Sequence, residues 1–231
     1  MTCCTRVKDI LDQVGRLLGD VDHRVWPPAQ LVSFINEALA ELMTYRPDAF
    51  SRTVTLTLGS GGKQVLPPEY HSIVDILQNL RDGKEGRPVQ EVADVTFRRF
   101  APLRTPIRVD EYEVWSWSRV KGDQRTFYVS PPVPEGRRVE VRAVVVVYPP
   151  RHVPEALERC LGVDRAYDAQ VVDWVLARAY EQDIESVRNT EMAARHKQQF
   201  YAALGVEYRQ ESAFRSGQWL GRTDEGQPAG G

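Results

Sequence analysis

Glycine-rich and nucleophilic motifs are the first features of this sequence that could indicate chemistry. Residues 59–62, Gly-Ser-Gly-Gly, have the composition of a phosphate-binding loop, but they precede an expected strand rather than a helix. A phosphate loop uses the free N–H groups at a helix start, so a plain hairpin turn is the favoured interpretation. The sequence contains no Walker loop, no GxGxxG, no HExxH and no GxSxG.

Metal-ligating residue types are present but scattered. No cysteine or carboxylate stands at a ligand spacing from the four histidines, which are His23, His71, His152 and His196. A loose acidic set consists of Asp9, Asp12, Asp20 and Asp22. The first two fall on the solvent side of an expected helix and the others in a turn, which does not favour a calcium site. We therefore expect no metal and no cofactor.

Catalytic nucleophiles and paired acids are not indicated either. Cys160 stands beside Leu161 and is interpreted as a small core residue. Glu111 and Glu113 lie on one face of an expected strand, but no pocket signal flanks them, so a solvated edge is the favoured interpretation. We expect no catalytic residue, and the leading hypothesis is a protein that is not an enzyme.

The cysteines and the apolar runs indicate in which cellular compartment the protein is made. Cys3, Cys4 and Cys160 are odd in number, and the adjacent pair has poor geometry for a mutual disulfide, which favours a reducing compartment. The N-terminus becomes charged too soon for a signal peptide. No apolar run approaches the roughly 20 residues that span a bilayer. We expect no membrane partner and a protein made in the cytoplasm.

Two tryptophans carry the one binding hypothesis that the residues suggest. Trp115 and Trp117 lie on one face of an expected strand, are followed by Arg119 and Lys121 and lie near four further arginines, and so could stack on single-stranded nucleic acid. The arginines are Arg98, Arg99, Arg104 and Arg108. Acidic residues interleave with them, and the net charge of the 231 residues is −2, so packing against a helix or a neighbouring subunit is favoured. Trp115 and Trp117 are thus a candidate interface.

The element that organises the chain is a helix within residues 26–50. Pro27 and Pro28 suit its first turn, and Pro47 ends it. Its apolar residues recur at steps of three and four, while Asn36, Glu37 and Glu41 fall on the wetter side. The predicted helical core residues are Leu11, Val14, Trp26, Leu31, Ile35, Leu39, Leu42 and Trp174.

Three further helices are predicted from similar patterns. The first is capped by Thr5 and ends at Gly19, so that it forms a hairpin with the helix after Trp26. Another begins at Asp164, and the last covers about 185–204 with Gly205 as its C-cap. A short helix is also predicted for 89–100.

Period-two patterns fill the middle of the chain. Strands are predicted for 51–58, 63–66, 113–120, 126–130 and 138–148, with 63–66 pairing back on the first as a hairpin. Residues 69–80 suit a strand or a short helix, and a strand with a leading turn is favoured. Residues 144–147 are apolar enough for a strand buried on both faces.

The predicted layout is an α+β fold in which N- and C-terminal helices form a bundle around a β-rich insertion. The units are residues 1–50 and 151–205 for the bundle, 51–150 for the insertion and 206–231 for an extended tail. The tail is too polar to fold alone, yet it contains Tyr208, Phe214, Trp219 and Leu220. An idle tail would be disordered, but these spaced apolar groups favour a docking segment that folds on a partner.

Residues 26–50 also resemble a known family. The pattern W-P-x-x-x-L-x-x-x-I-N-E-A-L-x-E-L, followed by R-P-D-A-F and a strand, resembles the head-to-tail adaptor proteins of tailed bacteriophages, especially short-tailed ones. The matching residues are Trp26, Pro27, Leu31, Ile35, Asn36, Glu37, Ala38, Leu39, Glu41, Leu42, Arg46, Pro47 and Asp48. The motif covers about a tenth of the chain, and the general layout covers most of it.

The resemblance implies a structural protein of the virion, assembled in the host cytoplasm. It implies a dodecameric ring of this chain seated under the portal protein, with a tail or nozzle protein on the other side. The C-terminal extension would climb onto the portal, and double-stranded DNA would pass through the channel without specific binding. A nearly neutral chain suits such a channel.

Overall fold

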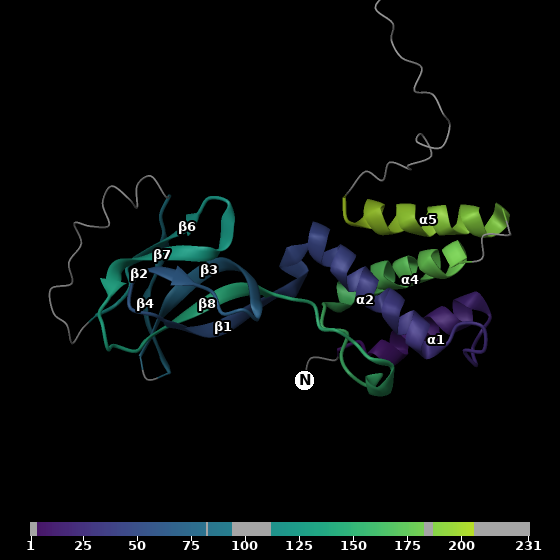
Figure 1. Cartoon of the computed structure of the whole chain (residues 1–231), viewed down its shortest axis with the longest axis horizontal. Coiled ribbons are helices and arrows are strands. Elements are labelled where there is room, and N and C mark those ends of the chain that lie inside the picture. Colours follow the sequence, from purple (N-terminus) through teal and green to yellow (C-terminus); the bar gives the residue numbers. More distant parts are fainter. Residues whose placement is uncertain (1–3, 82, 94–111, 183–186, 206–231) are drawn as a thin grey trace, which may run out of the picture.

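The computed structural model describes residues 4–81, 83–93, 112–182 and 187–205. Within these residues the chain is α+β, with four α-helices and two sheets (Figure 1). The helices are α1 (Val7–Leu18), α2 (Pro28–Tyr45), α4 (Asp168–Gln182) and α5 (Val187–Ala203), with short 3₁₀ turns η1 (Pro47–Phe50), η3 (Pro154–Ala156) and η4 (Arg165–Tyr167). The strands are β1 (Ser51–Leu58), β2 (Gly61–Val65), β3 (Tyr70–Arg81), β4 (Lys84–Pro88), β5 (Gln90–Glu91), β6 (Ser116–Val120), β7 (Asp123–Val133) and β8 (Val139–Val147).

The first helix begins later than its sequence pattern predicts. Arg6, and not Thr5, is the N-cap of α1, and the Asp9 carboxylate accepts the Arg6 backbone N–H at 2.9 Å. Thr5 instead donates its hydroxyl to Asp168 of α4 at 2.5 Å. The predicted end holds, because Gly19 closes α1 with a φ of 71°, a left-handed conformation that glycine adopts without strain.

The second helix has the boundaries that its prolines dictate. Pro28 is the first residue of α2, and the helix ends at Tyr45 before Pro47. The chain then makes one 3₁₀ turn, and β1 starts directly after Phe50. The β region therefore grows from the end of this helix, as predicted.

The C-terminal helices enclose the centre of the helical part. Asp164 caps the turn η4 by accepting the Ala166 N–H at 2.9 Å, and α4 continues from it. Helix α4 contacts α1, α2 and α5, so it lies inside the group (Figure 1). Gly205 follows α5 with a φ of 73°, in agreement with its predicted role as a C-cap.

The strands form two four-stranded sheets in the orders β1-β8-β3-β4 and β2-β7-β6-β5. The predicted hairpin of residues 63–66 with the first strand is wrong, because β1 pairs with β8 and β2 pairs with β7 in the other sheet. Turn signals show that a chain reverses but not which strand it then joins. The favoured strand at 69–80 is confirmed as β3. In place of the short helix predicted at 89–100, Gln90 and Glu91 form β5, and residues 94–100 lie outside the described part.

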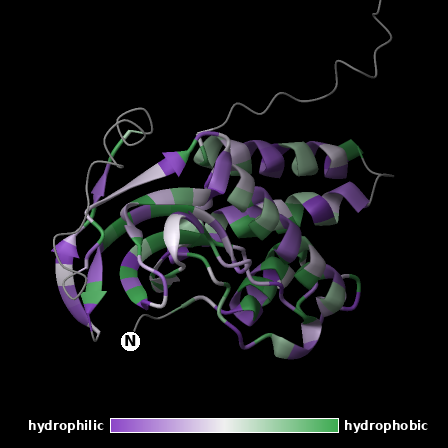
Figure 2. Ribbon diagram, turned by 60° about the vertical axis from the view of Figure 1, so that its left-hand side comes forward, coloured by the Kyte–Doolittle hydropathy of each residue, from purple (hydrophilic) through white to green (hydrophobic). Residues whose placement is uncertain are grey.

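Apolar side chains gather in two clusters, one among the helices and one between the sheets. The coloured ribbon shows hydrophilic and hydrophobic residues alternating along the elements (Figure 2). Strand β8 joins the two clusters, since Val146 belongs to the helical cluster while Val141, Ala143 and Val145 belong to the β cluster. Of the run 144–147, Val145 and Val146 are buried and the other two are half-buried. We refer below to the helical part, residues 4–50 and 151–205, and the β part, residues 51–147.

Candidate functional site

The histidines and acidic residues do not converge. His152 is buried in the chain between β8 and η3, whereas His196 pairs with Asp173 at 2.8 Å between α5 and α4. His71 packs edge-on against Tyr148. Among the described residues, no group of three or more histidine, cysteine, aspartate or glutamate side chains could hold a metal ion.

The polar residues of α2 are instead brought together with distant elements. The Asn36 amide donates to the His152 carbonyl at 3.0 Å and accepts the His152 N–H at 2.8 Å. These two bonds fasten the segment that returns from the β part onto α2. The prediction that Asn36 lies on the wetter side misses this role, because a helical repeat identifies the apolar face and not the partners of the other face.

Two glutamates of α2 reach the C-terminal helices. Glu37 accepts from the Arg178 guanidinium of α4 at 2.7 Å, and Glu41 accepts the Tyr201 hydroxyl of α5 at 2.6 Å. Both glutamates are half-buried. The Tyr201 ring also packs edge-on against Tyr45 at the end of α2, with ring centroids 5.4 Å apart. Asn36, Glu37 and Glu41 thus bind α2 to three different segments.

The turn after α2 is closed by an ion pair. The Arg46 guanidinium donates to both carboxylate oxygens of Asp48, at 2.9 and 2.8 Å. This bidentate pair lowers the pKa of the Asp48 carboxyl. The Arg46 guanidinium also lies 5.7 Å from the centre of the Tyr167 ring, in η4. The pair therefore sets the direction in which the chain leaves α2 for β1.

Pro47 and Asp48 line a cavity of about 350 Å³ between this turn and the β part. Its other walls come from β3, from Val146 of β8, and from the β6–β7 hairpin with Arg119. The Arg119 guanidinium donates to the Val74 carbonyl and pairs with Glu91 at 2.8 Å. The cavity marks where the helical and β parts meet.

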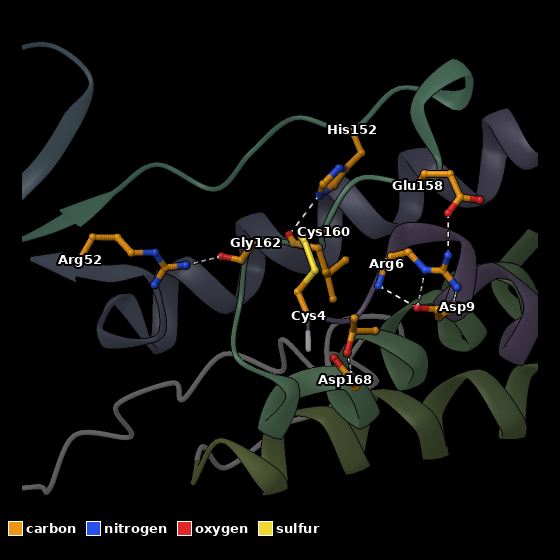
Figure 3. The surroundings of a disulfide bond; sticks show 11 residues. Cys4, Arg6, Asp9, Arg52, His152, Glu158, Cys160, Gly162 and Asp168 are labelled. Atoms are coloured by element: carbon orange, nitrogen blue, oxygen red, sulfur yellow. Dashed lines mark hydrogen bonds and ion pairs between the residues drawn. A yellow bond between two sulfur atoms is a disulfide. The ribbon is translucent and has the colours of Figure 1, made fainter. Parts of the chain in front are cut away.

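A disulfide ties the N-terminus to the segment that leads from β8 to η4. Cys4 and Cys160 form the bond, with Cα atoms 5.6 Å apart (Figure 3). The interpretation of Cys160 as a small core residue is wrong, since both cysteines are exposed. The cysteines therefore do not support the inference of a reducing compartment. Sequence position could not reveal the pairing, because 156 residues separate the two.

His152 lies beside this disulfide and is buried. Its side chain is 4% exposed, and its Nε2 lies 3.1 Å from the Leu161 carbonyl, to which it donates. Burial lowers the pKa of the His152 imidazole, since the charged ring would lose its hydration. Burial thus favours the neutral ring within the segment that Asn36 fastens.

The predicted helical core residues lie in or against one apolar cluster. Leu11, Val14, Leu31, Ile35, Leu39 and Leu42 are at most 2% exposed. Trp26 and Trp174 are half-buried and pack against the same cluster. Trp26 lies outside α2, because the helix begins at Pro28.

The two tryptophans of the candidate interface have different surroundings. Trp117 is fully buried in the β cluster, with its ring edge-on to Phe127 at 6.3 Å. Trp115 precedes β6, is half-buried, and lies 6.0 Å from the Arg87 guanidinium. A fully buried Trp117 cannot stack on nucleic acid as one of a pair of indoles, and it packs within the β cluster rather than against a helix or a neighbouring subunit. An interface role of Trp115 stays a prediction. The four arginines named with them lie outside the described residues.

The tail residues Tyr208, Phe214, Trp219 and Leu220 also lie outside the described part of the chain, which ends at Gly205. The last described turn of α5 lies against the end of α2, through the contacts of Tyr201 with Glu41 and Tyr45. The C-terminal end of α5 therefore lies close to the end of α2.

Comparison with known families assigns the chain. A family model described as SU10 adaptor protein matches residues 5–220, which is most of the sequence. The chain belongs to this family of phage head-to-tail adaptor proteins. No curated protein matches the sequence. The match covers both the helical part and the β part of the adaptor, and it extends into the tail.

Family membership makes the protein a phage structural component and implies a place in the virion with portal and tail proteins as partners. In the adaptor, the residues of the α2 motif are scaffold residues. They connect α2 to α4, to α5 and to the chain returning from the β part. None of the described helices has the length and apolarity needed to cross a bilayer.

Proposed function

We propose that this adaptor forms a dodecameric ring between the portal and the tail or nozzle protein, and that the ring completes the channel for double-stranded DNA. The observation that carries the proposal is the family match over residues 5–220. The DNA would slide through without specific binding, which a net charge of −2 supports because few phosphates would be neutralised. Assembly would take place in the host cytoplasm.

The proposed domains of the adaptor correspond to the two apolar clusters. Residues 1–50 and 151–205 would act as one helical domain, and residues 51–150 as an inserted β domain. A closed ring of identical subunits uses two different faces of each subunit. Exposed apolar side chains on both parts support this arrangement, with Val21 and Val25 at 67% and 69% exposure on the helical part and Val65 at 62% on the β part.

The C-terminal segment 206–231 would bind the portal through Tyr208, Phe214, Trp219 and Leu220. Such a segment gains order only on its partner, where its spaced apolar side chains become buried. Its start beside Tyr201 and the end of α2 supports a tail that leaves from a rigid point of the helical part.

Portal attachment by a full-length variant tests this role. Replacing Tyr208, Phe214, Trp219 and Leu220 together by alanine removes four apolar anchors and should lower adaptor occupancy on purified portal at least tenfold, measured by co-sedimentation. The matched control Gln210→Ala/Gln218→Ala changes the same tail but removes no apolar anchor, and it should attach normally. A truncation ending at Gly205 should also fail to attach, and wild-type attachment by either altered tail would refute the docking role.

A further inference from the structure

The Cys4–Cys160 pair lies where two backbone segments already hold each other. The Leu161 N–H donates to the Thr5 carbonyl at 2.8 Å, and the Val7 N–H donates to the Arg159 carbonyl at 3.0 Å. Arg6 and Cys160 are antiparallel bridge partners. Backbone bonds do not depend on the oxidation state of sulfur, so the two cysteines remain neighbours with or without the covalent bond.

Side chains around the cysteines add contacts that are likewise independent of the sulfurs. Arg6 pairs with Glu158 at 2.7 Å (Figure 3), and Thr5 donates to Asp168 at 2.5 Å. The N-terminal segment is therefore docked against residues 157–161 and α4 before any disulfide forms. A pair held in this way closes into a disulfide with little rearrangement once an oxidant is present.

Both cysteines are also accessible to solvent, since Cys4 and Cys160 are exposed residues in the structure. Accessibility decides whether the pair can respond to its surroundings, because thiol oxidation and disulfide reduction both need contact with a small reagent. Buried structural cysteines would be inert in this respect.

We propose that the Cys4–Cys160 bond is a redox-timed staple, present as two thiols while the adaptor is in the host cytoplasm and closed after the particle is released. The timing rests on the assignment to a phage virion protein. Bacterial cytoplasm keeps thiols reduced, whereas the extracellular medium is oxidising. On release, the two thiols lose two protons and two electrons as the S–S bond forms, and dissolved dioxygen takes both and becomes hydrogen peroxide.

The staple would secure the chain that connects the two parts of the adaptor. Residues 148–164 run from β8 to η4, and they are held by Asn36 through His152 and by the Arg52 guanidinium, which donates to the Gly162 carbonyl at 2.8 Å. The disulfide adds a covalent tie between this segment and the N-terminus, across a sequence separation of 156. Assembly would thus occur with an open pair, and the released particle would carry the more stable helical part.

The first test measures the bond directly. Trypsin cleaves after Arg6, Arg159 and Arg165, so an intact bond joins residues 1–6 to residues 160–165 in one disulfide-linked peptide. Infected cells are quenched with acid and an alkylating reagent, and free virions are alkylated after exposure to air. We expect the linked peptide in virions and alkylated thiols in the cell extract. A Cys3→Ser phage should give the same result, which assigns the bond to Cys4.

The second test measures what the bond does. Purified full-length adaptor, oxidised in air, should melt on the order of 10 °C higher than the same protein with a thiol reductant, because the cross-link restricts the unfolded chain. The Cys160→Ser variant should have the melting temperature of the reduced protein, and the reductant should not change it. A linked peptide already complete in quenched cells, its absence from virions, or equal melting temperatures would each overturn the proposal. Neither readout depends on portal attachment, so failure here is distinct from failure of the adaptor role.

Discussion

The helical part and the β part are held together by different kinds of contact. In the helical part, side chains join elements far apart in the sequence, as Glu37 does with Arg178 across 141 residues and Tyr201 with Glu41 across 160. In the β part, backbone ladders do most of this work, with β8 paired over its length to β1 on one side and to β3 on the other.

A buried asparagine of the β part makes a side-chain clamp of comparable kind. Asn79, 4% exposed, donates to the carbonyls of Arg87 and Val114 and accepts the Val114 N–H, all between 2.8 and 2.9 Å. It fastens β4 and the approach to β6 onto β3, and so resembles Asn36 of the helical part. The two asparagines differ in burial, because Asn36 is half-buried.

The two kinds of contact constrain the sequence differently. Contacts made by particular side chains demand particular residues, whereas a backbone ladder accepts any sequence with the right alternation. The motif in α2 therefore contains specific residues such as Asn36 and Glu37, whereas the sequence of the β part shows only an alternation of apolar and polar residues. The comparison can be tested by breaking each part in turn.

The largest effect is expected from the two apolar cores. Trp117→Ala in the β part should lower the free energy of unfolding by about 3–5 kcal/mol, and Leu39→Ala in the helical part by about 2–5 kcal/mol, because both side chains are fully buried. Denaturant titration followed by far-UV circular dichroism and by tryptophan fluorescence measures both.

The same titrations show whether the parts unfold together. Since β8 contributes to both apolar clusters, we expect coincident transitions by the two probes in each variant. The substitution Ser33→Ala, at an exposed position of α2, is the control and should change the stability by less than about 0.5 kcal/mol. Separate transitions in the Trp117 variant would show that the helical part is an independent unit.

An intermediate effect is expected from the two asparagine clamps. Asn79→Ala leaves a buried N–H and carbonyl of Val114 without partners and should cost about 3 kcal/mol, measured by the same titrations. Asn36→Ala should cost about 1–2 kcal/mol, because water can reach the half-buried site. Gln13→Ala, on the exposed face of α1, serves as the control. If the two substitutions lowered the free energy of unfolding equally, burial would not explain the difference between the two asparagines.

The smallest effect is a pH dependence confined to the helical part. Burial lowers the pKa of His152 in the folded state, so the unfolded chain, with an ordinary pKa of about 6.5, takes up the proton first as the pH falls. The stability present above about pH 6.5 should therefore decrease toward lower pH, with a slope of at most about 1.4 kcal/mol per pH unit. Thermal melts at pH 7.5 and 5.5 measure it. His152→Gln should flatten this part of the profile, and an unchanged slope would assign it to other groups.

Periodicity and turn residues predicted most element boundaries. Prolines at 28 and 47 bracket α2 as expected, and glycines at 19 and 205 end α1 and α5. These signals act locally, through fixed φ angles and missing N–H groups, and so they can be read along the chain. The strand partners of residues 61–65 could not be read in this way, because pairing depends on loops that bring distant segments together.

The sequence alone determined where the four helices and most of the strands form, which faces are apolar, and that residues 26–50 resemble phage head-to-tail adaptors. Tertiary structure alone decided that Trp117 is buried, that Cys4 meets Cys160, and that the polar residues of α2 hold α4, α5 and the connecting segment. The physical reason is the distance along the sequence over which each interaction acts. Backbone conformation responds to neighbours within a few residues, whereas a side-chain pair or a disulfide needs two segments whose proximity only the folded chain creates.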